Sequence, residues 1–330
     1  MTTSTPLARS VLDLDAAAET DRVERFIRDA VFKRLRRRGL VVGMSGGVDS
    51  SVVAALAARA LGADKVIGLL MPETDSAPES ARLAQALADG LGIRSCVENV
   101  TGALEAAGCY RRRDEAIRSV IPEYGDGSRC KIVLPDLVAS DAYALYSIVV
   151  RLASGEERRV RLPLDAYLQI VAATNFKQRV RKTMEYYYAD RYRFAVAGTA
   201  NRLEHDQGFF VKHGDGAADV KPIAHLYKSQ VYQLAAYLDI PDEIQRRRPT
   251  TDTYSLDQSQ EEFYFGLSLE QTDLCVYATD HGIDPEAVAD TVGLTPDQVE
   301  RAYRVIASKR EAARYLHMPA LLVDEADGTR

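Results

Sequence analysis

The sequence is poor in the features that mark secreted, membrane-spanning and nucleic-acid-binding proteins. Its four cysteines (Cys96, Cys109, Cys130 and Cys275) are too few for a disulfide framework and form no C-x-x-C pair of the zinc-binding kind. No apolar run approaches the roughly 20 residues that a membrane-spanning helix needs. The 42 basic and 48 acidic residues give a net charge of −6, which argues against broad nonspecific nucleic-acid binding.

The N-terminal residues also lack a targeting signal. Residues 1–20 are polar and acidic, whereas a signal peptide is basic and then apolar. We therefore expect a cytoplasmic protein that binds neither nucleic acid nor a membrane. Its 330 residues, 46% apolar and 27% charged, have the composition of an ordinary globular protein with one large or two ordinary domains.

Two kinds of apolar pattern alternate along much of the chain. Strands are predicted at 40–44, 65–71, 94–100 and 193–198, and the first two are short apolar runs typical of strands buried on both faces of a sheet. Stretches of helical periodicity lie at 16–38, 51–62, 79–92, 176–190 and 228–238. This β-α-β alternation predicts an α/β fold with a doubly wound, mainly parallel sheet.

Residues 109–172 interrupt this alternation. Strand-like runs lie at 131–134, 146–152 and 159–162, and the last two flank a hairpin turn at 153–156. We interpret 109–172 as an inserted β-rich segment within a main domain that spans 16–260. Residues 261–330 are expected to form a helical C-terminal region, residues 1–15 a loose leader and residues 324–330 a frayed tail.

A glycine-rich loop follows the first predicted strand and precedes a predicted helix. Its residues are Ser45, Gly46, Gly47, Val48, Asp49, Ser50 and Ser51. Two glycines allow a tight turn and a close approach to a ligand, while hydroxyls and free N–H groups at the helix start suit an anion. The loop matches neither G-x-x-x-x-G-K-[ST] nor G-x-G-x-x-G. The structural alternative is a strand–helix turn in which Asp49 caps the helix.

The loop resembles the S-G-G-x-D-S pyrophosphate loop of the N-type ATP pyrophosphatases. This resemblance implies that the loop grips the β- and γ-phosphates of ATP. It also implies that ATP is cleaved between the α- and β-phosphates, which leaves AMP on a substrate oxygen.

Further motifs are similar to those of the NAD synthetases within that superfamily. These motifs are the segments 68–72 and 76–80, N-F-K-Q-R-V-R at 175–181, G-T-A-N-R-L-E at 198–204, G-F-F-V-K-H-G-D-G-A-A-D at 208–219, L-Y-K-S-Q-V at 226–231 and P-T-T-D at 249–252. The resemblance covers roughly 40–93 and 175–252, and it does not cover the insertion. It implies an ATP- and Mg²⁺-dependent amide synthetase.

The resemblance also implies roles for individual residues. ATP-binding residues are Ser45 to Ser51 together with Thr199, Lys228 and Thr250. Asp49 and Glu204 match the Mg²⁺ ligands, and with Lys228 they form the expected catalytic set. Arg179, Lys212 and Asp219 match residues that hold the nicotinate dinucleotide. These residue types fit the chemistry, because an anionic carboxylate approaching an anionic α-phosphate needs neutralisation by Mg²⁺ and basic side chains.

The sequence departs from the family near its C-terminus. Family members often carry E-H-K-R-R-P-P there, whereas this chain has Ser308 and Lys309 in place of the His-Lys pair and lacks the R-P-P continuation. The insertion is also longer than usual. Both departures concern the acyl-substrate side, so amide formation through adenylation is better supported than any one acyl substrate. We expect deamido-NAD, with Ser308 and Lys309 near it.

Several other hypotheses remain open at this stage. The chain could amidate another carboxylate in specialised metabolism, or thiolate tRNA, which would need an activated cysteine. It could be a nucleotide-binding module without activity, in which the charged residues named above are merely solvated. A chain of 330 residues leaves no room for a glutaminase domain beside this core, so free ammonia is expected unless a separate glutaminase docks. Like the family, the protein is expected to be a homodimer.

Overall fold

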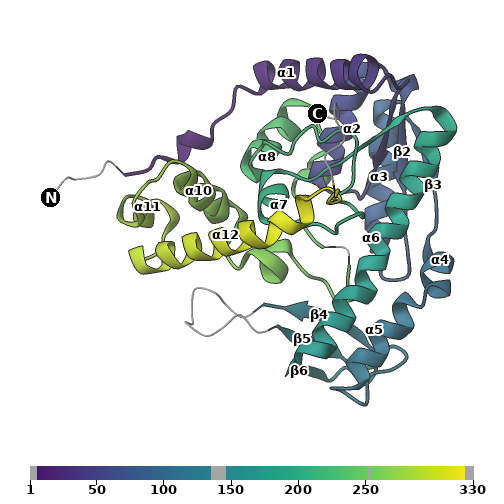
Figure 1. The fold of residues 1–330 in the computed structure, drawn as a ribbon, viewed down its shortest axis with the longest axis vertical. Helices are drawn as coiled ribbons and strands as arrows, with labels where there is room; N and C mark the ends of the chain where they lie inside the picture. Colours follow the sequence, from purple (N-terminus) through teal and green to yellow (C-terminus); the bar gives the residue numbers. More distant parts are fainter. Residues whose placement is uncertain (1–5, 135–145, 252, 324–330) are drawn as a thin grey trace.

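The computed structural model describes residues 6–134, 146–251 and 253–323. Within these ranges the central sheet has four parallel strands in the order β3-β2-β1-β7 (Figure 1). The strands are β1 (Leu40–Gly43), β2 (Val66–Leu70), β3 (Arg94–Val97) and β7 (Ala195–Ala197). Leu40 pairs with Val66 on one side and with Ala195 on the other, so β1 lies in the interior of the sheet.

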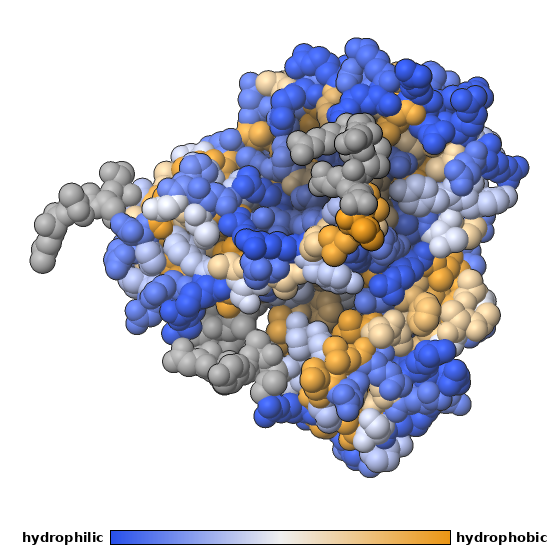
Figure 2. Space-filling view, viewed as in Figure 1, coloured by the Kyte–Doolittle hydropathy of each residue, from blue (hydrophilic) through white to orange (hydrophobic). Residues whose placement is uncertain are grey.

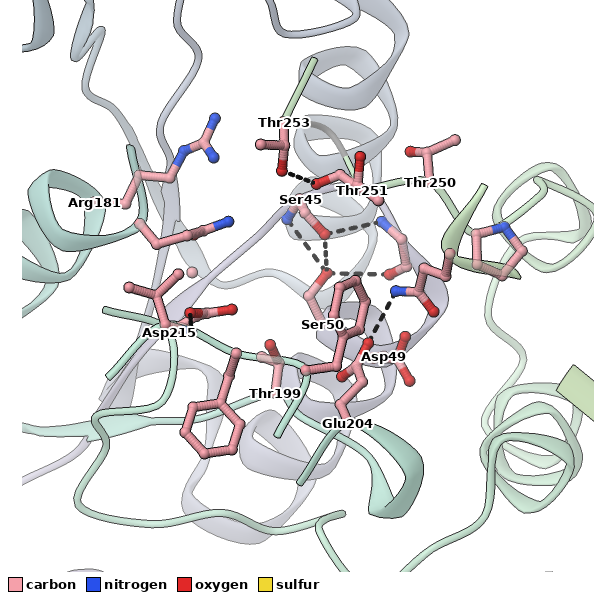
Figure 3. Close-up of a pocket in the computed structure, with 18 of the residues that line it drawn as sticks. Ser45, Asp49, Ser50, Arg181, Thr199, Glu204, Asp215, Thr250, Thr251 and Thr253 are labelled. Atoms are coloured by element: carbon pink, nitrogen blue, oxygen red, sulfur yellow. Dashed lines mark hydrogen bonds between the residues drawn. The ribbon is translucent and has the colours of Figure 1, made fainter. Parts of the chain in front are cut away.

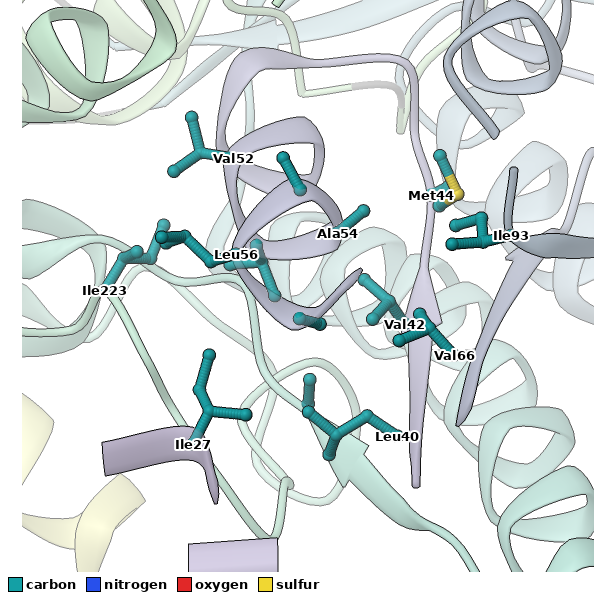
Figure 4. Packing of buried hydrophobic residues seen from close by; sticks show 14 of the residues in the cluster. Ile27, Leu40, Val42, Met44, Val52, Ala54, Leu56, Val66, Ile93 and Ile223 are labelled. Carbon is teal, nitrogen blue, oxygen red and sulfur yellow. The ribbon is translucent and has the colours of Figure 1, made fainter. Parts of the chain in front are cut away.

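Helices cover both faces of this sheet. One face carries α1 (Ala16–Arg28), α2 (Val48–Leu61), α3 (Pro78–Leu91) and α8 (Lys228–Tyr237), and the other carries α6 (Leu164–Tyr192). Leu40 and Val42 pack into the first layer (Figure 4), whereas Val41 between them packs with the side chains of α6. Because successive strand side chains point to opposite faces, a doubly covered strand needs an unbroken apolar run. The predicted doubly wound, mainly parallel α/β sheet is confirmed.

Two of these helices, α1 and α6, differ from their predicted ranges. The helix predicted over 16–38 ends at Arg28 and continues as a π-helical turn, η2 (Asp29–Arg34). The helix predicted over 176–190 is longer, because α6 already begins at Leu164. The sequence pattern missed these first turns because their apolar side chains lie on two sides of the helix: Leu164 and Leu168 are exposed, whereas Ala166 and Ile170 are buried.

The inserted segment 109–172 is part helix and part sheet. It contains α5 (Cys109–Arg118), the antiparallel strands β4 (Arg129–Val133), β5 (Ser147–Arg151) and β6 (Glu157–Arg161), and the first turns of α6. The three predicted strands are confirmed, but the β-rich interpretation is wrong at both ends of the segment. The sheet, α5 and α6 share a small core that includes Ile117, Ile132 and Ile170.

Short elements connect the layers. They are η1 (Arg9–Leu12), η3 (Ala63–Lys65), α4 (Thr101–Ala106), α7 (Arg202–Gln207), α9 (Asp242–Gln245) and η4 (Glu261–Phe265). The loop between Gly43 and Val48 joins the end of β1 to α2. A second loop joins the end of β7 to α7. Both loops therefore lie at the carboxyl edge of the parallel sheet.

The C-terminal region is helical, as predicted. It contains α10 (Leu269–Asp280), α11 (Pro285–Val292) and α12 (Pro296–His317), which enclose a second apolar core. Leu7 and Leu12 are buried in this core, so residues 6–15 differ from the loose leader that we expected. The few apolar residues here, which include Leu7, Val11 and Leu12, form too short a stretch to predict packing against a core. The expected tail at 324–330 lies outside the described residues. No helix in the described ranges has the length and apolarity needed to cross a membrane.

Candidate active site

A cavity of about 430 Å³ opens at the carboxyl edge of the central sheet. Its walls come from the loop after β1, residues 70–72 after β2, residues 199–200 after β7, one face of α6, and the segment 247–254 (Figure 3). In open α/β sheets, ligands bind at the carboxyl ends of the strands, at the point where the strand order reverses direction. The order β3-β2-β1-β7 places that reversal between β1 and β7.

The loop after β1 is held in shape by its own hydroxyl groups. Ser50 Oγ accepts a hydrogen bond from Ser45 N (3.3 Å) and donates one to Gly47 O (3.1 Å), while Ser51 Oγ donates to the same carbonyl (2.8 Å). Gly46 has φ +73°, and a Cβ there would lie 2.4 Å from Ser80 O. Only glycine therefore fits at this turn.

The loop leads directly into the N-terminus of α2, where backbone N–H groups favour an anion. Gly47 occupies the N-cap position of α2, and Asp49 lies within the first turn. Asp49 lines the cavity instead of capping the helix. This geometry argues against the purely structural interpretation of the loop.

Asp49, Glu204 and Lys228 come together although they are far apart in the sequence. Lys228 Nζ forms an ion pair with Asp49 Oδ2, and Asn201 Nδ2 donates to Asp49 Oδ1 (3.0 Å). Glu204 Oε1 accepts from Gln260 Nε2 (2.9 Å), and Glu204 also closes the capping box of α7. All three predicted catalytic residues therefore line one cavity.

The electrostatics of this trio show an excess of negative charge. Burial, and next the charge of Asp49, raise the pKa of Glu204 to about 8. Burial alone would lower the pKa of Lys228. The negative charges of Asp49 and Glu204 have the larger combined effect, so the pKa of Lys228 is raised. A cation beside the two carboxylates would relieve their repulsion.

The two carboxylates fit Mg²⁺. No cluster of three or more His, Cys, Asp or Glu side chains that could hold a metal occurs in the part of the chain that the structure describes. Mg²⁺ commonly binds through one or two carboxylates together with substrate phosphates and waters, so a set of two oxygen donors suits it. Asp49 and Glu204 are therefore the residues that would hold this ion.

The helical C-terminal region positions Lys228. Asp273 of α10 is fully buried and accepts hydrogen bonds from Lys228 N (3.1 Å) and Ser229 N (2.7 Å) at the start of α8. This carboxylate satisfies two N–H groups that the helix itself leaves unpaired. The ammonium of Lys228 is thereby held over the phosphate loop from a fixed backbone.

Thr199 and Thr250, the other predicted ATP contacts, also line the cavity. Arg247, which was not among the predicted site residues, lines the cavity as well and donates to Ser80 Oγ (2.8 Å) and Gly46 O (3.4 Å). A run of three arginines at 246–248, just before Thr250, is the signal that could have indicated it.

A second group of buried charges was also missed. Lys182 and Glu185 of α6 line the cavity as an ion pair (2.6 Å), next to Asp215, which accepts from Val211 N (2.7 Å). Burial raises the pKa of both Glu185 and Asp215. Gln178, Lys182 and Glu185 are four and three residues apart and therefore lie on one face of α6. This spacing would have indicated the pair only if that face had been known to line the cavity.

The five predicted substrate residues lie elsewhere. None of Arg179, Lys212, Asp219, Ser308 and Lys309 is among the described residues that line the cavity. Arg179 Nε donates to Lys212 O (3.3 Å), while Lys212 Nζ donates to Tyr315 O (2.8 Å) and Met318 O (3.0 Å) at the end of α12. Asp219 accepts from Val196 N (2.8 Å), and Ser308 is exposed on α12. Their roles toward a substrate stay predictions.

Lys309 instead packs against the aromatic residues of η4. Its Nζ donates to Tyr264 O (2.5 Å) and lies 4.3 Å from the centre of the Tyr264 ring. Burial lowers the pKa of Lys309 to about 7. Tyr264 lines the cavity, so Lys309 reaches the cavity only through this ring.

We expect this lysine to make the stability of the protein depend on pH. The unfolded chain keeps the proton on Lys309 up to its ordinary pKa of 10.5, whereas the folded chain releases it near 7. The unfolded state then holds more protons between these values, so the free energy of unfolding rises with pH across this window. The melting temperature of Lys309→Met minus that of the wild type should fall from pH 7 to pH 10. A constant difference would contradict this prediction.

The sheet, the S-G-G-V-D-S loop at its carboxyl edge and the buried Asp49–Lys228 pair define a nucleotide-using α/β enzyme of the pyrophosphate-loop class. Comparison with known proteins narrows the class. The family model for NAD synthase matches residues 19–120 and 152–314. The chain belongs to the NAD synthase family, and the family predicted from the sequence is thus confirmed. The internal unmatched segment, 121–151, contains β4 and β5 but none of the predicted site residues.

Curated relatives resemble the chain over nearly its whole length. The NH(3)-dependent NAD(+) synthetase of Rhizobium rhizogenes is 56% identical over 317 residues, which cover 96% of this chain and 96% of the relative. The enzyme of the same name from Mesorhizobium japonicum is 56% identical over 312 residues, 94% of this chain and 98% of the relative. The chain is therefore a carbon–nitrogen ligase of the NAD synthase type.

Solved structures share the fold. The NH3-dependent NAD synthetase of Campylobacter jejuni has a TM-score of 0.62 at 21% identity and covers 94% of this chain and 100% of its own. The NMN synthetase of Francisella tularensis has a TM-score of 0.59 at 21% identity, covering 94% of this chain and 99% of its own. At these identities the likeness concerns the fold alone.

Proposed function

We propose that this protein converts deamido-NAD to NAD with ATP and ammonia. ATP transfers its AMP group to the nicotinate carboxylate, pyrophosphate leaves, and ammonia then displaces AMP. The observation that carries the proposal is the placement of Asp49, Glu204 and Lys228 around the phosphate loop of one cavity. Curated relatives at 54–56% identity, all named NH(3)-dependent NAD(+) synthetases, support the same activity.

The phosphate loop and Lys228 act on the pyrophosphate that leaves. The loop amides and the hydroxyls of Ser45 and Ser50 lie where they can bind the β- and γ-phosphate oxygens, and Lys228 adds a fixed positive charge. Asp49 and Glu204 would hold Mg²⁺, which supplies further neutralisation of the phosphates when bound. No covalent enzyme nucleophile is needed, because AMP itself is the leaving group of the acyl intermediate.

The amidation step needs a group that can take a proton from the attacking nitrogen. Asp215 suits this role because it lies in the cavity and burial raises its pKa, which makes its carboxylate a stronger base. The nearby pair Lys182–Glu185 keeps a balanced charge in the same region. An acyl adenylate bound in the cavity would be shielded from water, which hydrolyses it, by the side chains of α6 and of residues 247–251.

The alternatives from the sequence are less well supported. A tRNA thiolase needs an activated cysteine, but burial raises the pKa of both Cys109 and Cys130, which opposes thiolate formation. An inactive nucleotide-binding module would not need the Asp49–Lys228 pair. Another acyl substrate is less well supported, because the two relatives at 56% identity are both named NH(3)-dependent NAD(+) synthetases.

The experiment is a steady-state assay with ATP, Mg²⁺ and ammonium, comparing deamido-NAD with nicotinate mononucleotide and simpler carboxylates. We expect NAD to form from deamido-NAD, and Arg179→Ala and Lys212→Ala to raise its KM more than they lower kcat. No conversion of deamido-NAD, with conversion of another carboxylate, would overturn the proposal. Activity with ammonium alone would also argue against a need for a separate glutaminase.

The oligomeric state and the cellular location are part of the same proposal. We infer a cytoplasmic homodimer. Two large apolar side chains at the start of α6, Leu164 and Leu168, are 68% and 52% exposed, which supports an interface there. Figure 2 shows apolar residues on the face over α6. Light scattering should give twice the mass of one chain, whereas a fully active monomer would contradict the inference.

A further inference from the structure

A buried lysine outside the cavity connects two of its walls. Lys177 of α6 is 0% exposed, and its ammonium has three partners. These are Glu73 Oε1 (3.0 Å), Asp75 Oδ2 (2.6 Å) and the backbone carbonyl of Thr253 (2.7 Å). An ammonium has three N–H donors, so each donor of this side chain has an acceptor.

The two carboxylates belong to the segment after β2. Glu73 also accepts from Tyr110 Oη (2.7 Å) and from Asp75 N (3.1 Å), so its position is tightly defined. On the same segment Ser76 Oγ accepts a hydrogen bond from Glu73 N (3.2 Å), and Ser76 lines the cavity. This segment is therefore a rigid support for the ammonium.

The third partner belongs to the wall on the other side of the phosphate loop. Thr253 lines the cavity, and its Oγ1 donates to Thr251 O (2.9 Å), which links these two threonines. Thr250, the predicted ATP contact, directly precedes them. Figure 3 shows Thr250, Thr251 and Thr253 along one side of the cavity that also holds Ser45.

Lys177 shares one of its carboxylates with a second cation. Arg113, 6% exposed, forms ion pairs with the same Asp75 oxygen and with Asp114 Oδ1 (2.8 Å), so two cations face three carboxylates. A buried ion pair by itself is weak evidence for stability, since apolar replacements of whole pairs are often neutral. What distinguishes Lys177 from Arg113 is the hydrogen bond to Thr253.

We propose that Lys177 is a positioning residue for the ATP site. It anchors the Thr250–Thr253 wall to α6 and to the segment after β2, and it touches no reacting atom. The inference rests on the proposed function only in taking ATP as the ligand of this cavity. Without the anchor, the wall is free to move, and ATP binding has to restore its order.

The test compares two variants that each remove one buried cation from Asp75. Lys177→Met loses the Thr253 contact, and Arg113→Met keeps it. We expect Lys177→Met to weaken binding of α,β-methylene-ATP about tenfold, the size of one charge-assisted hydrogen bond, with a matching rise in the KM for ATP. Arg113→Met should bind the analogue as the wild type does, although both variants lose thermal stability. Calorimetry measures the binding without any acyl substrate.

A double variant keeps the test decisive if Lys177→Met folds poorly. Glu73→Gln with Lys177→Met removes one charge of each sign, so stability should recover while the loss of ATP affinity remains. Unchanged affinity in the double variant, or an equal loss of affinity in Arg113→Met, would overturn the proposal. Failure of the wild type to bind the analogue would count instead against the proposed function.

Discussion

Asp49→Asn and Glu204→Gln each lower kcat by about 100- to 1,000-fold, the range measured for one oriented electrostatic contact at a reacting centre. Each variant replaces one of the two carboxyl groups that lie near Lys228 and would hold Mg²⁺. Neither should unfold the protein. Because the pKa of Glu204 is raised, folding favours its neutral form, and the uncharged glutamine should keep or raise the melting temperature.

The measurement is kcat at saturating substrates over a range of Mg²⁺ concentrations. Asp89→Asn on α3 is a suitable control, since this carboxylate is exposed and pairs only with Gln85 among its described contacts. Turnover close to that of the wild type in both site variants under limiting Mg²⁺ would contradict the assignment of these carboxylates.

Lys228→Met has an effect of similar size on kcat, about 100- to 1,000-fold. The variant loses the one positive charge of the trio, which would neutralise the phosphates. The start of α8 is still held by Asp273, because its two hydrogen bonds go to backbone N–H groups. Lys228→Arg keeps a cation of different shape and should retain more activity than the methionine variant. The KM for ATP should change less than kcat, because the charge is needed most as pyrophosphate departs.

Lys65→Met is the matched control for this prediction. Lys65 lies just before β2, at the opposite edge of the sheet from the cavity, and its Nζ donates to Leu61 O (3.2 Å). It should leave kcat unchanged. If Lys228→Met turns over like this control, the lysine is a structural partner of Asp49 and our mechanism is wrong.

The sequence predicts β1, β2 and β7 of the central sheet well because these strands are buried on both faces. Runs such as Leu40-Val41-Val42 carry an unambiguous signal, whereas the early turns of α6 do not. Helix α5 was missed because three arginines follow Tyr110 and hide its apolar side. One of them, Arg113, is buried against Asp75, which only the tertiary structure reveals.

The site is predictable where a motif carries the chemistry. The phosphate loop is contiguous, and resemblance to a family adds Glu204 and Lys228 from distant positions. Asp215 stands inside a quoted motif, but no local pattern marks it as a cavity residue. Lys177 depends on Glu73 and Thr253, 104 and 76 residues away, so its contacts could not be inferred from spacing.

The most direct test of the account is the stoichiometry of products from deamido-NAD, ammonium and ATP, measured by chromatography in one reaction. Adenylation of the carboxylate predicts one AMP and one pyrophosphate for each NAD formed, with all three absent when deamido-NAD is left out. Formation of ADP and orthophosphate in amounts equal to NAD would contradict it, because the phosphate loop would then serve cleavage between the β- and γ-phosphates.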